Sequence, residues 1–167
     1  MCMKYINVTT RCYKSITTEE NNIVSYDIPF TSIRCNDDEN GHIYINNFSI
    51  VTHINALGTN NDKHKNDNPL EKGRKLDFII RLTKCSTDES KRIGYDLDSF
   101  TIDLGGIQES GKAERACFDF VNYTRTTNVD KLELPGGIGR YVIKVLVKDS
   151  EENEYTIQTM FQLTVAA

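Results

Sequence analysis

The stretch that decides the fold class is "YVIKVLVKDSEENEYTIQTMFQLTV", residues 141–165. In its first half, apolar side chains occupy every second position, at Tyr141, Ile143, Val145 and Val147, and the alternate positions hold Val142, Lys144, Leu146 and Lys148. After a polar tip at 149–154, a second run places apolar side chains on one face, at Tyr155, Ile157, Phe161, Leu163 and Val165. Successive side chains of a strand point to opposite faces of the sheet. Two such runs joined by a short polar turn predict a β-hairpin with one buried face.

Weaker runs of the same kind recur upstream, at 4–9, 23–28, 42–54, 76–84, 99–104 and 116–123. No segment carries a sustained apolar stripe with the helical period of 3.6 residues. Short helices are predicted at 87–92, where Ser86 and Glu89 have the spacing of a capping box, and at 112–117. We therefore predict an all-β fold: an antiparallel β-sandwich, immunoglobulin-like or jelly-roll, with about eight strands and one or two short helices.

The length of 167 residues suits one domain, which we expect to span 1–167. Residues 55–75 are almost entirely polar with Gly and Pro interruptions, which predicts a long loop of the mobile or functional kind. No internal repeat or linker divides the chain.

The net charge of −4, from 20 basic and 24 acidic residues, argues against a nucleic-acid partner, which requires a concentrated basic surface. No apolar run has the length of a transmembrane helix, so no membrane partner is expected. The first residues lack the apolar core of a secretory signal, and the five cysteines are widely spaced without a C-x-x-C pair. We expect a cytoplasmic protein with reduced thiols.

The segment "LGGIQESGKA" at 104–113 comes within one residue of the phosphate-loop pattern, with Gly106, Gly111 and Lys112 in register. Ala113 stands where the magnesium-binding hydroxyl belongs, and Glu109 would put a carboxylate among the phosphates. Phosphate loops also need a helix to follow, whereas alternation returns at "ACFDFVNY". We interpret this segment as a strand connection and expect no cofactor. The second glycine cluster, "LPGGIGRY" at 134–141, precedes a strand and is likewise interpreted as a turn.

Two acidic turns are candidates for calcium. In "NDDENG" at 36–41, oxygen ligands alternate at Asn36, Asp38 and Asn40, although Asn47 occupies the position where a bidentate Glu is expected. The tip at 149–154 offers Asp149, Glu151, Glu152 and Glu154. Turns favour the same residue types without any metal, so calcium binding stays an alternative.

The remaining candidates are isolated side chains. His42, His53 and His64 lie eleven residues apart, a spacing that does not place them on one strand face, and we expect surface histidines without a shared metal. Cys117, between Arg115 and Asp119 on the same face, could act as a nucleophile with a distant His, but a lone Cys on a strand more often serves packing. We therefore assign no catalytic, cofactor-binding or metal-binding residue.

The segment 132–165, with a glycine turn, the pattern Tyr-x-Ile-x-Val-x-Val and a second alternating strand, resembles the closing hairpin of bacterial immunoglobulin-like β-sandwiches. "LDFIIRLTK" and "SFTIDLGG" are similar to the paired strands of small bacterial β-sandwich proteins of unknown function. The resemblance implies a fold and carries no catalytic residues.

From these observations we expect a non-enzymatic sandwich that binds a protein partner, forms a homo-oligomer, or serves as an accessory or structural component. The sandwich edges and the 55–75 loop are the expected contact surfaces. The alternative is a calcium- or small-ligand-binding module, or an atypical enzyme using Cys117.

Overall fold

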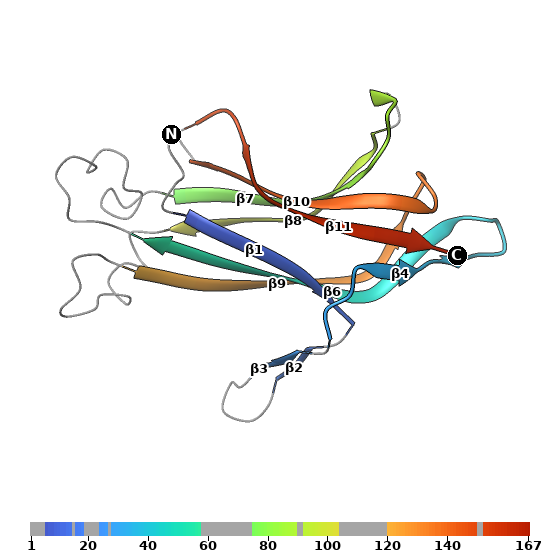
Figure 1. The fold of residues 1–167 in the computed structure, drawn as a ribbon, viewed down its shortest axis with the longest axis horizontal. Coiled ribbons are helices and arrows are strands. Elements are labelled where there is room, and N and C mark those ends of the chain that lie inside the picture. The colour runs from blue at the N-terminus through green and yellow to red at the C-terminus, as the bar shows by residue number, and fades with distance from the viewer. Residues whose placement is uncertain are drawn as a thin grey trace.

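A computed structural model of the chain describes residues 6–14, 16–18, 24–26, 28–57, 75–89, 92–103, 120–149 and 152–167. The two main sheets lie face to face as the layers of a sandwich, and a two-stranded hairpin, β2–β3, projects from one side (Figure 1). The strands are β1 (Ile6–Tyr13), β2 (Ile16–Thr18), β3 (Val24–Tyr26), β4 (Ser32–Arg34), β5 (Asn36–Asp37), β6 (Ile43–Leu57), β7 (Lys75–Lys84), β8 (Gly94–Asp103), β9 (Phe120–Glu133), β10 (Gly139–Asp149) and β11 (Thr156–Ala166). The predicted all-β sandwich is confirmed.

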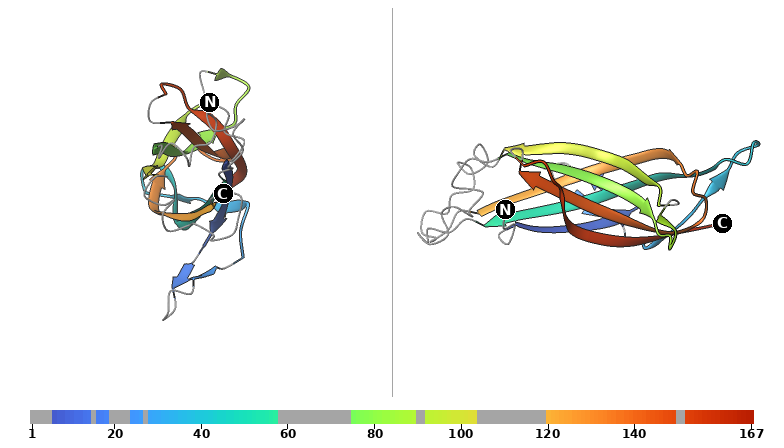
Figure 2. Two further views of the ribbon diagram at one scale, coloured as in Figure 1. Left: turned by 90° about the vertical axis from the view of Figure 1, so that its left-hand side faces the viewer. Right: turned by 90° about the horizontal axis from the view of Figure 1, so that it is seen from above.

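The first layer is built around the long strand β6. On one side β6 pairs with β9, from Tyr44 to Leu57, and on the other side it pairs first with β5 and then with β1. All of these pairings are antiparallel. Because β9 occupies the whole of one edge of β6, β5 and β1 follow one another along the other edge. The layer is therefore three strands wide, and its long strands run along the long axis of the molecule (Figure 2).

The second layer has the order β4-β11-β10-β7-β8. The hairpin predicted at 141–165 is present as β10 and β11, and the predicted pairing of 76–84 with the strand that contains 99–103 is present as β7 and β8. β4 is the exception to the antiparallel pattern, because it runs parallel to β11 over Ser32–Arg34.

One side of the sandwich is closed by the chain itself. Phe30 forms a bridge with Cys12 of β1, and the strand that follows, β4, pairs with the last residues of β11. Residues 30–34 thus join the edge of one layer to the edge of the other. On the opposite side, β8 and β9 are the edge strands, and neither has a second strand neighbour among the described residues.

The core lies between the layers and consists of two apolar clusters. The first contains Ile50, Ile80 and Ile143, and the second contains Ile54, Phe78 and Val147. The predicted inward residues of β7 and β10 are all fully buried, namely Leu76, Phe78, Ile80, Leu82, Tyr141, Ile143, Val145 and Val147. Burial of each such side chain contributes about 1.5–3 kcal/mol, which makes this interior the main source of stability.

The prediction for the second strand of the hairpin is wrong in its first residues. Phe161, Leu163 and Val165 face inward, but Ile157 is 48% exposed and Tyr155 is 37% exposed. The reason is a β-bulge, because Val145 pairs with Thr159 and the next residue pairs with Ile157, which leaves Gln158 as the extra residue. An extra residue reverses the face on which all preceding side chains lie.

The helix predicted at 87–92 is not an α-helix where it is described: 87 and 88 are bends, Glu89 has a 3₁₀ conformation with its carbonyl accepting from Arg92 N, and 90–91 lie outside the described residues. The backbone N–H of Asp88 donates to Ser86 Oγ, the bond that an N-cap residue makes to the second position of a helical turn. The connection has only nine residues, and its ends are held together where Lys84 N donates to Ile93 O. The helix predicted at 112–117 lies outside the described residues.

Other boundaries differ from the predictions. β8 begins at Gly94, five residues earlier than predicted, and β9 continues to Glu133, ten residues later. Residues 55–57 belong to β6 and residue 75 to β7, so the predicted loop is shorter at both ends, and 58–74 lie outside the described residues. The glycine cluster forms the predicted turn, with Gly137 at φ 68° and its N–H donating to Leu134 O.

Candidate interaction face on the five-stranded sheet

The outer face of the five-stranded sheet combines cations with exposed apolar side chains. Strand register places Asp96, Arg81, Lys144 and Met160 in one row across β8, β7, β10 and β11. Arg81 and Lys144 are therefore direct cross-strand neighbours of like charge, an arrangement that destabilises a sheet unless an anion intervenes.

Asp96 supplies that anion to Arg81 alone. Arg81 Nε lies 2.5 Å from Asp96 Oδ1, and Nη2 lies 3.2 Å from Oδ2, so the guanidinium holds the carboxylate with two hydrogen bonds. The hydrogen bonds from Arg81 lower the pKa of Asp96 below its usual value. The side chain of Lys144 has no ion-pair or hydrogen-bond partner among the described residues. This row leaves one positive charge uncompensated.

The two neighbouring rows are apolar or small. One row contains Ile79, Leu146 and Ile157, and the bulge at Gln158 is what brings Ile157 to the outer face. The other contains Gly94, Thr83, Val142 and Gln162. Gly94 has no side chain, and a Cβ there would lie 3.4 Å from Arg81 Cδ. Because Gly94 has no side chain, the surface beside Arg81 stays open.

Two adjoining hollows lie over these rows. The larger has a volume of about 710 Å³ and the smaller about 570 Å³. They share Thr83, Arg92 and Lys144 as walls, so we treat them as one depression, called the furrow below. Its further lining includes Ser86, Thr87, Arg140, Val142, Met160, Arg81, Gly94, Asp96, Leu146 and Ile157.

The connection between β7 and β8 forms one wall of the furrow. Arg92 is positioned there by a hydrogen bond from Nε to Ser86 O at 3.1 Å and by Glu89 at 3.5 Å. Arg140 enters from β10, where its backbone carbonyl accepts from Cys85 N, while its side chain has no partner among the described residues. Arg92, Arg140 and Lys144 therefore line a single depression in a chain of net negative charge, together with Lys84, whose Nζ donates to the carbonyls of Gly136 and Ile138.

The outer face of the other sheet has a different composition. Its residues on β9 are neutral and polar for most of the strand, at Asn122, Thr124, Thr126 and Asn128. Except for Thr126, which lies opposite Val51, they pair with polar neighbours on β6, as where Ser49 Oγ donates to Asn128 Oδ1 at 2.7 Å. Such uncharged pairs satisfy one another and offer no net charge to a partner.

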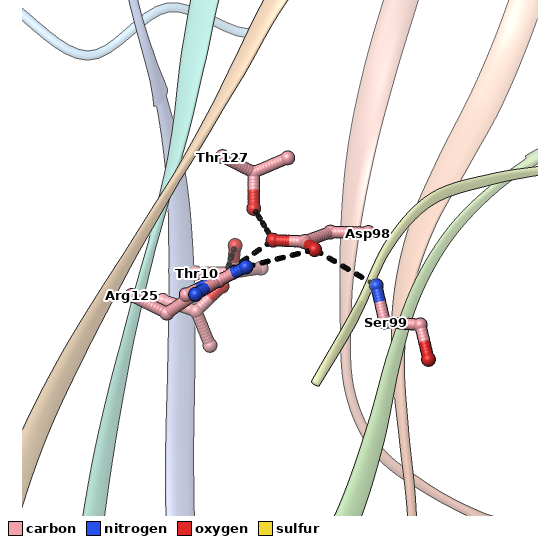
Figure 3. Close-up of polar contacts among 6 residues, drawn as sticks. Thr10, Asp98, Ser99, Arg125 and Thr127 are labelled. Atoms are coloured by element: carbon pink, nitrogen blue, oxygen red, sulfur yellow. Dashed lines mark hydrogen bonds and ion pairs between the residues drawn. The ribbon is translucent and has the colours of Figure 1, made fainter. Parts of the chain in front are cut away.

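A group of polar contacts, called the polar belt below, lies between the two sheets (Figure 3). Asp98 of β8 accepts from Arg125 Nε at 2.9 Å and from Thr127 Oγ1 at 2.7 Å, both on β9, and thereby links the edges of the two sheets. The buried hydroxyls of Thr10 and Thr52, 3.4 Å apart, continue the belt across β1 and β6. Leu97 is the extra residue of a β-bulge that turns Asp98 inward, opposite Ile80.

Burial alone raises the pKa of the Asp98 carboxyl, but the hydrogen bonds from Arg125 and Thr127 and the Arg125 charge outweigh it, so the pKa is lowered. Arg125 also stacks on Phe100, with its Cζ 4.8 Å from the ring centroid. The belt binds the two layers to each other, and its partners satisfy one another internally. We interpret it as structural.

The calcium candidate at 36–41 is a self-contained turn. Asp38 Oδ1 accepts from the backbone N–H groups of Asn40 and His42, each at 2.9 Å, and Oδ2 lies 3.1 Å from His42 Nδ1. The hydrogen bond from the His42 backbone is the largest cause of the lowered pKa of Asp38. Both carboxylate oxygens of Asp38 therefore already have partners within the turn.

The other predicted candidates are not brought together. In the tip, Asp149 is buried and 150–151 lie outside the described residues, as do the phosphate-loop look-alike at 104–113, His64 and Cys117. His53 lies on β6, with Nδ1 3.0 Å from Thr124 Oγ1, well separated in the fold from the turn of His42. Within the described residues, no group of three His, Cys, Asp or Glu side chains could hold a metal ion. Calcium binding and Cys117 chemistry stay predictions.

Sequence reasoning missed the residues of the furrow. Lys144 and Leu146 were placed correctly on the outer face, but Ile157 was placed inside, and Arg92 was placed in a helix. The signal available was the cross-strand pairing of Lys144 with Arg81, which follows once β7 and β10 are known to be neighbours. That neighbourhood is a property of topology and cannot be read from alternation.

No protein-family model matches the chain, and no curated protein matches its sequence. None of the helices in the described residues is long and apolar enough to span a membrane. Among solved structures, the chain is similar to the CooA pilin subunit from enterotoxigenic Escherichia coli, with a TM-score of 0.38 and 7% sequence identity over 97% of each chain. At that distance the likeness assigns neither a function nor a site residue to this chain.

Proposed function

We propose that this chain is a non-enzymatic binding module that holds a protein partner on the furrow face of its five-stranded sheet. The observation that carries the proposal is the combination, on that one face, of unpaired cations with exposed apolar side chains. On the opposite face, the outward residues of β9 are neutral and polar from Asn122 to Asn128, and the exposed charged residues of β9 lie only further along, at Asp130, Lys131 and Glu133.

The apolar component favours a protein partner over a polyanion. Met160 is 63% exposed and Ile157 is 48% exposed, and both lie beside the cations. Protein interfaces combine a buried apolar centre with a polar rim, and methionine and arginine are enriched there. A nucleic-acid surface would instead need many more cations and no apolar centre.

The proposal assigns no reaction and no cofactor to the chain. Cys12 is fully buried, and burial raises the pKa of its thiol to about 12, which suppresses the reactive thiolate. The described cysteines Cys12, Cys35 and Cys85 are unpaired, which fits a reducing compartment such as the cytoplasm. The location stays part of the proposal.

Membership in the bacterial immunoglobulin-like sandwiches is likewise proposed. It is supported by the hairpin of β10 and β11, which lies where the resemblance places it, and by the layered arrangement of the two sheets. The bulge in β11 and the parallel strand β4 are individual features of this chain.

The test is affinity capture from lysate of the source organism with three forms of the purified protein. The double variant Lys144→Glu/Met160→Ser alters the furrow face, and Lys131→Glu introduces the same charge change on the other sheet. Any partner that depends on the furrow is captured by wild type and by Lys131→Glu and is lost from the double variant, as quantified by mass spectrometry. Capture that is identical for all three proteins would falsify the proposal.

A further inference from the structure

We infer that the partner reaches the furrow with an extended acidic segment that carries aliphatic side chains next to its carboxylates. This inference rests on the proposed function, because it names the chemistry of the partner that the furrow face would hold. It follows from three properties of the furrow: its unpaired charge, its hydroxyl groups and its apolar flank.

The first property is the charge. Arg140 and Lys144 have side chains without anionic partners among the described residues, and Arg92 has only Glu89, at 3.5 Å on an exposed loop. These three cations line the larger hollow together. Carboxylates of a bound segment would supply the missing partners, and partial burial would strengthen those pairs relative to exposed ones.

The second property is the hydroxyl lining. Thr83, Ser86 and Thr87 stand among the cations in the larger hollow. A hydroxyl can donate to a carboxylate or to a peptide carbonyl, so this lining suits a segment with both groups.

The third property is the apolar flank. Met160 and Val142 line the larger hollow, and Leu146 and Ile157 line the smaller one. Because the two hollows share Lys144, a residue bound beside this lysine has an aliphatic surface on each side of it. A segment that carries both acidic and aliphatic side chains matches this lining.

The dimensions favour an extended segment. The smaller hollow reaches from Gly94 and Asp96 on β8 to Ile157 on β11, which crosses four strands. Neighbouring strands lie about 4.8 Å apart, so the crossing measures about 14 Å. An extended chain covers this length with about five residues at roughly 3.3 Å each.

The probe is a fluorescein-labelled peptide of about eight residues that alternates Glu and Asp with Leu and Val, a length set by the rise of an extended chain. The control peptide has Gln and Asn in place of the acidic residues. Binding is followed by fluorescence anisotropy. We expect the acidic peptide to bind wild type, the amide peptide to bind roughly tenfold more weakly or not at all, and binding to weaken as NaCl rises to roughly 0.5 M.

Two variants and one control localise the site. Lys144→Glu is expected to weaken binding at least about tenfold, and Gly94→Val to weaken it by filling the low part of the furrow next to Arg81. Val is a good strand former, so the Gly94→Val protein should fold, which circular dichroism checks. Lys131→Glu, on the other sheet, is expected to bind as wild type does.

Several results would overturn the inference: equal binding of the acidic and amide peptides, equal binding by Lys144→Glu, or equally tight binding of a single-stranded oligonucleotide. Concentration-dependent self-association, measured by sedimentation and abolished by Lys144→Glu, would replace the peptide by a second copy of this chain. If partner capture depends on the furrow while the acidic peptide does not bind, this inference fails and the proposed function stands. If neither partner capture nor peptide binding depends on the furrow, both this inference and the proposed function fail.

Discussion

The two outer faces of this sandwich are built on the same plan and carry different chemistry. On the four-stranded layer, β9 presents Asn122, Thr124, Thr126 and Asn128, all of which except Thr126 pair with polar neighbours on β6. On the five-stranded layer, the matching positions hold Arg81, Lys144, Met160 and Ile157 around a hollow. Inner residues secure the fold in both layers, so the outer residues are free to differ. The difference indicates which face is adapted for a partner.

The comparison depends on the contact between the layers that Asp98 makes with Arg125 and Thr127, called the joint below. Asp98 of β8 reaches across to Arg125 and Thr127 of β9, where the two edge strands meet. The same strand carries Asp96, two residues earlier, on the furrow face. The bulge at Leu97 therefore separates one carboxylate that ties the layers together from another that holds an exposed arginine.

The largest expected effect comes from breaking the joint. Asp98→Ala leaves the guanidinium of Arg125 and the buried hydroxyl of Thr127 without their acceptor, whereas the wild-type Asp98 side chain is only 15% exposed. We expect the free energy of unfolding to fall by about 2–3 kcal/mol, as for loss of one partner from a partly buried ion pair. Urea denaturation followed by circular dichroism measures it.

Asp96→Ala is the matched control, since it removes the same side chain from the same strand on the outer face. Asp96 is 51% exposed, so its ion pair with Arg81 is screened by solvent and its loss should cost about 0.5 kcal/mol. Equal losses in the two variants would show that the Asp98 joint contributes no more than a surface pair.

The next effect is the pH dependence of the joint. The pKa of Asp98 is lowered in the folded protein, so its contribution is present above the unfolded pKa of about 3.9 and is lost as pH falls through the folded pKa. We expect the difference in unfolding free energy between wild type and Asp98→Asn to be greatest near neutral pH. It should shrink below about pH 4.

This measurement isolates Asp98 from Asp38 and Asp96, whose pKa values are also lowered and which are present in both proteins. A difference that stays constant down to about pH 3 would mean that the ionised form of Asp98 has no special role. Thermal melts of both proteins across the pH range provide the data.

The joint also explains where the sequence pattern failed. The predicted strand at 99–104 began too late because the inward Asp98 interrupts the apolar alternation, and the strand at 116–123 ended too early because the inward Arg125 and Thr127 do the same. These interruptions mark the polar belt, where inward side chains satisfy one another instead of packing. Where the inward residues are apolar, as in β7 and β10, alternation predicted the fully buried positions.

The rest of the site depends on pairing between distant strands. Alternation places Lys144 on an outer face, but only the register of β10 with β7 brings it beside Arg81, and only the bulge at Gln158 brings Ile157 beside Leu146. Bulges depend on the balance of pairing and packing in the assembled sheet. Their positions cannot be read from one strand, so the fold class was predictable and the furrow was not.

The smallest expected effect tests the comparison between the faces directly. In the furrow, Lys144→Glu replaces a like-charge neighbour of Arg81 by an opposite charge, and we expect a gain of about 0.5 kcal/mol in unfolding free energy. On the other sheet, Lys131 lies over the Tyr44 ring with Nζ 4.2 Å from the centroid, so Lys131→Glu should cost about 0.5 kcal/mol. The same substitution therefore changes the unfolding free energy in opposite directions on the two faces.

Chemical denaturation of both variants at low salt measures the two changes, and the Lys144→Glu gain should diminish as salt screens the new pair. A loss of stability in Lys144→Glu would mean that the lysine is already compensated, and the argument for an unpaired charge in the furrow would fail with it.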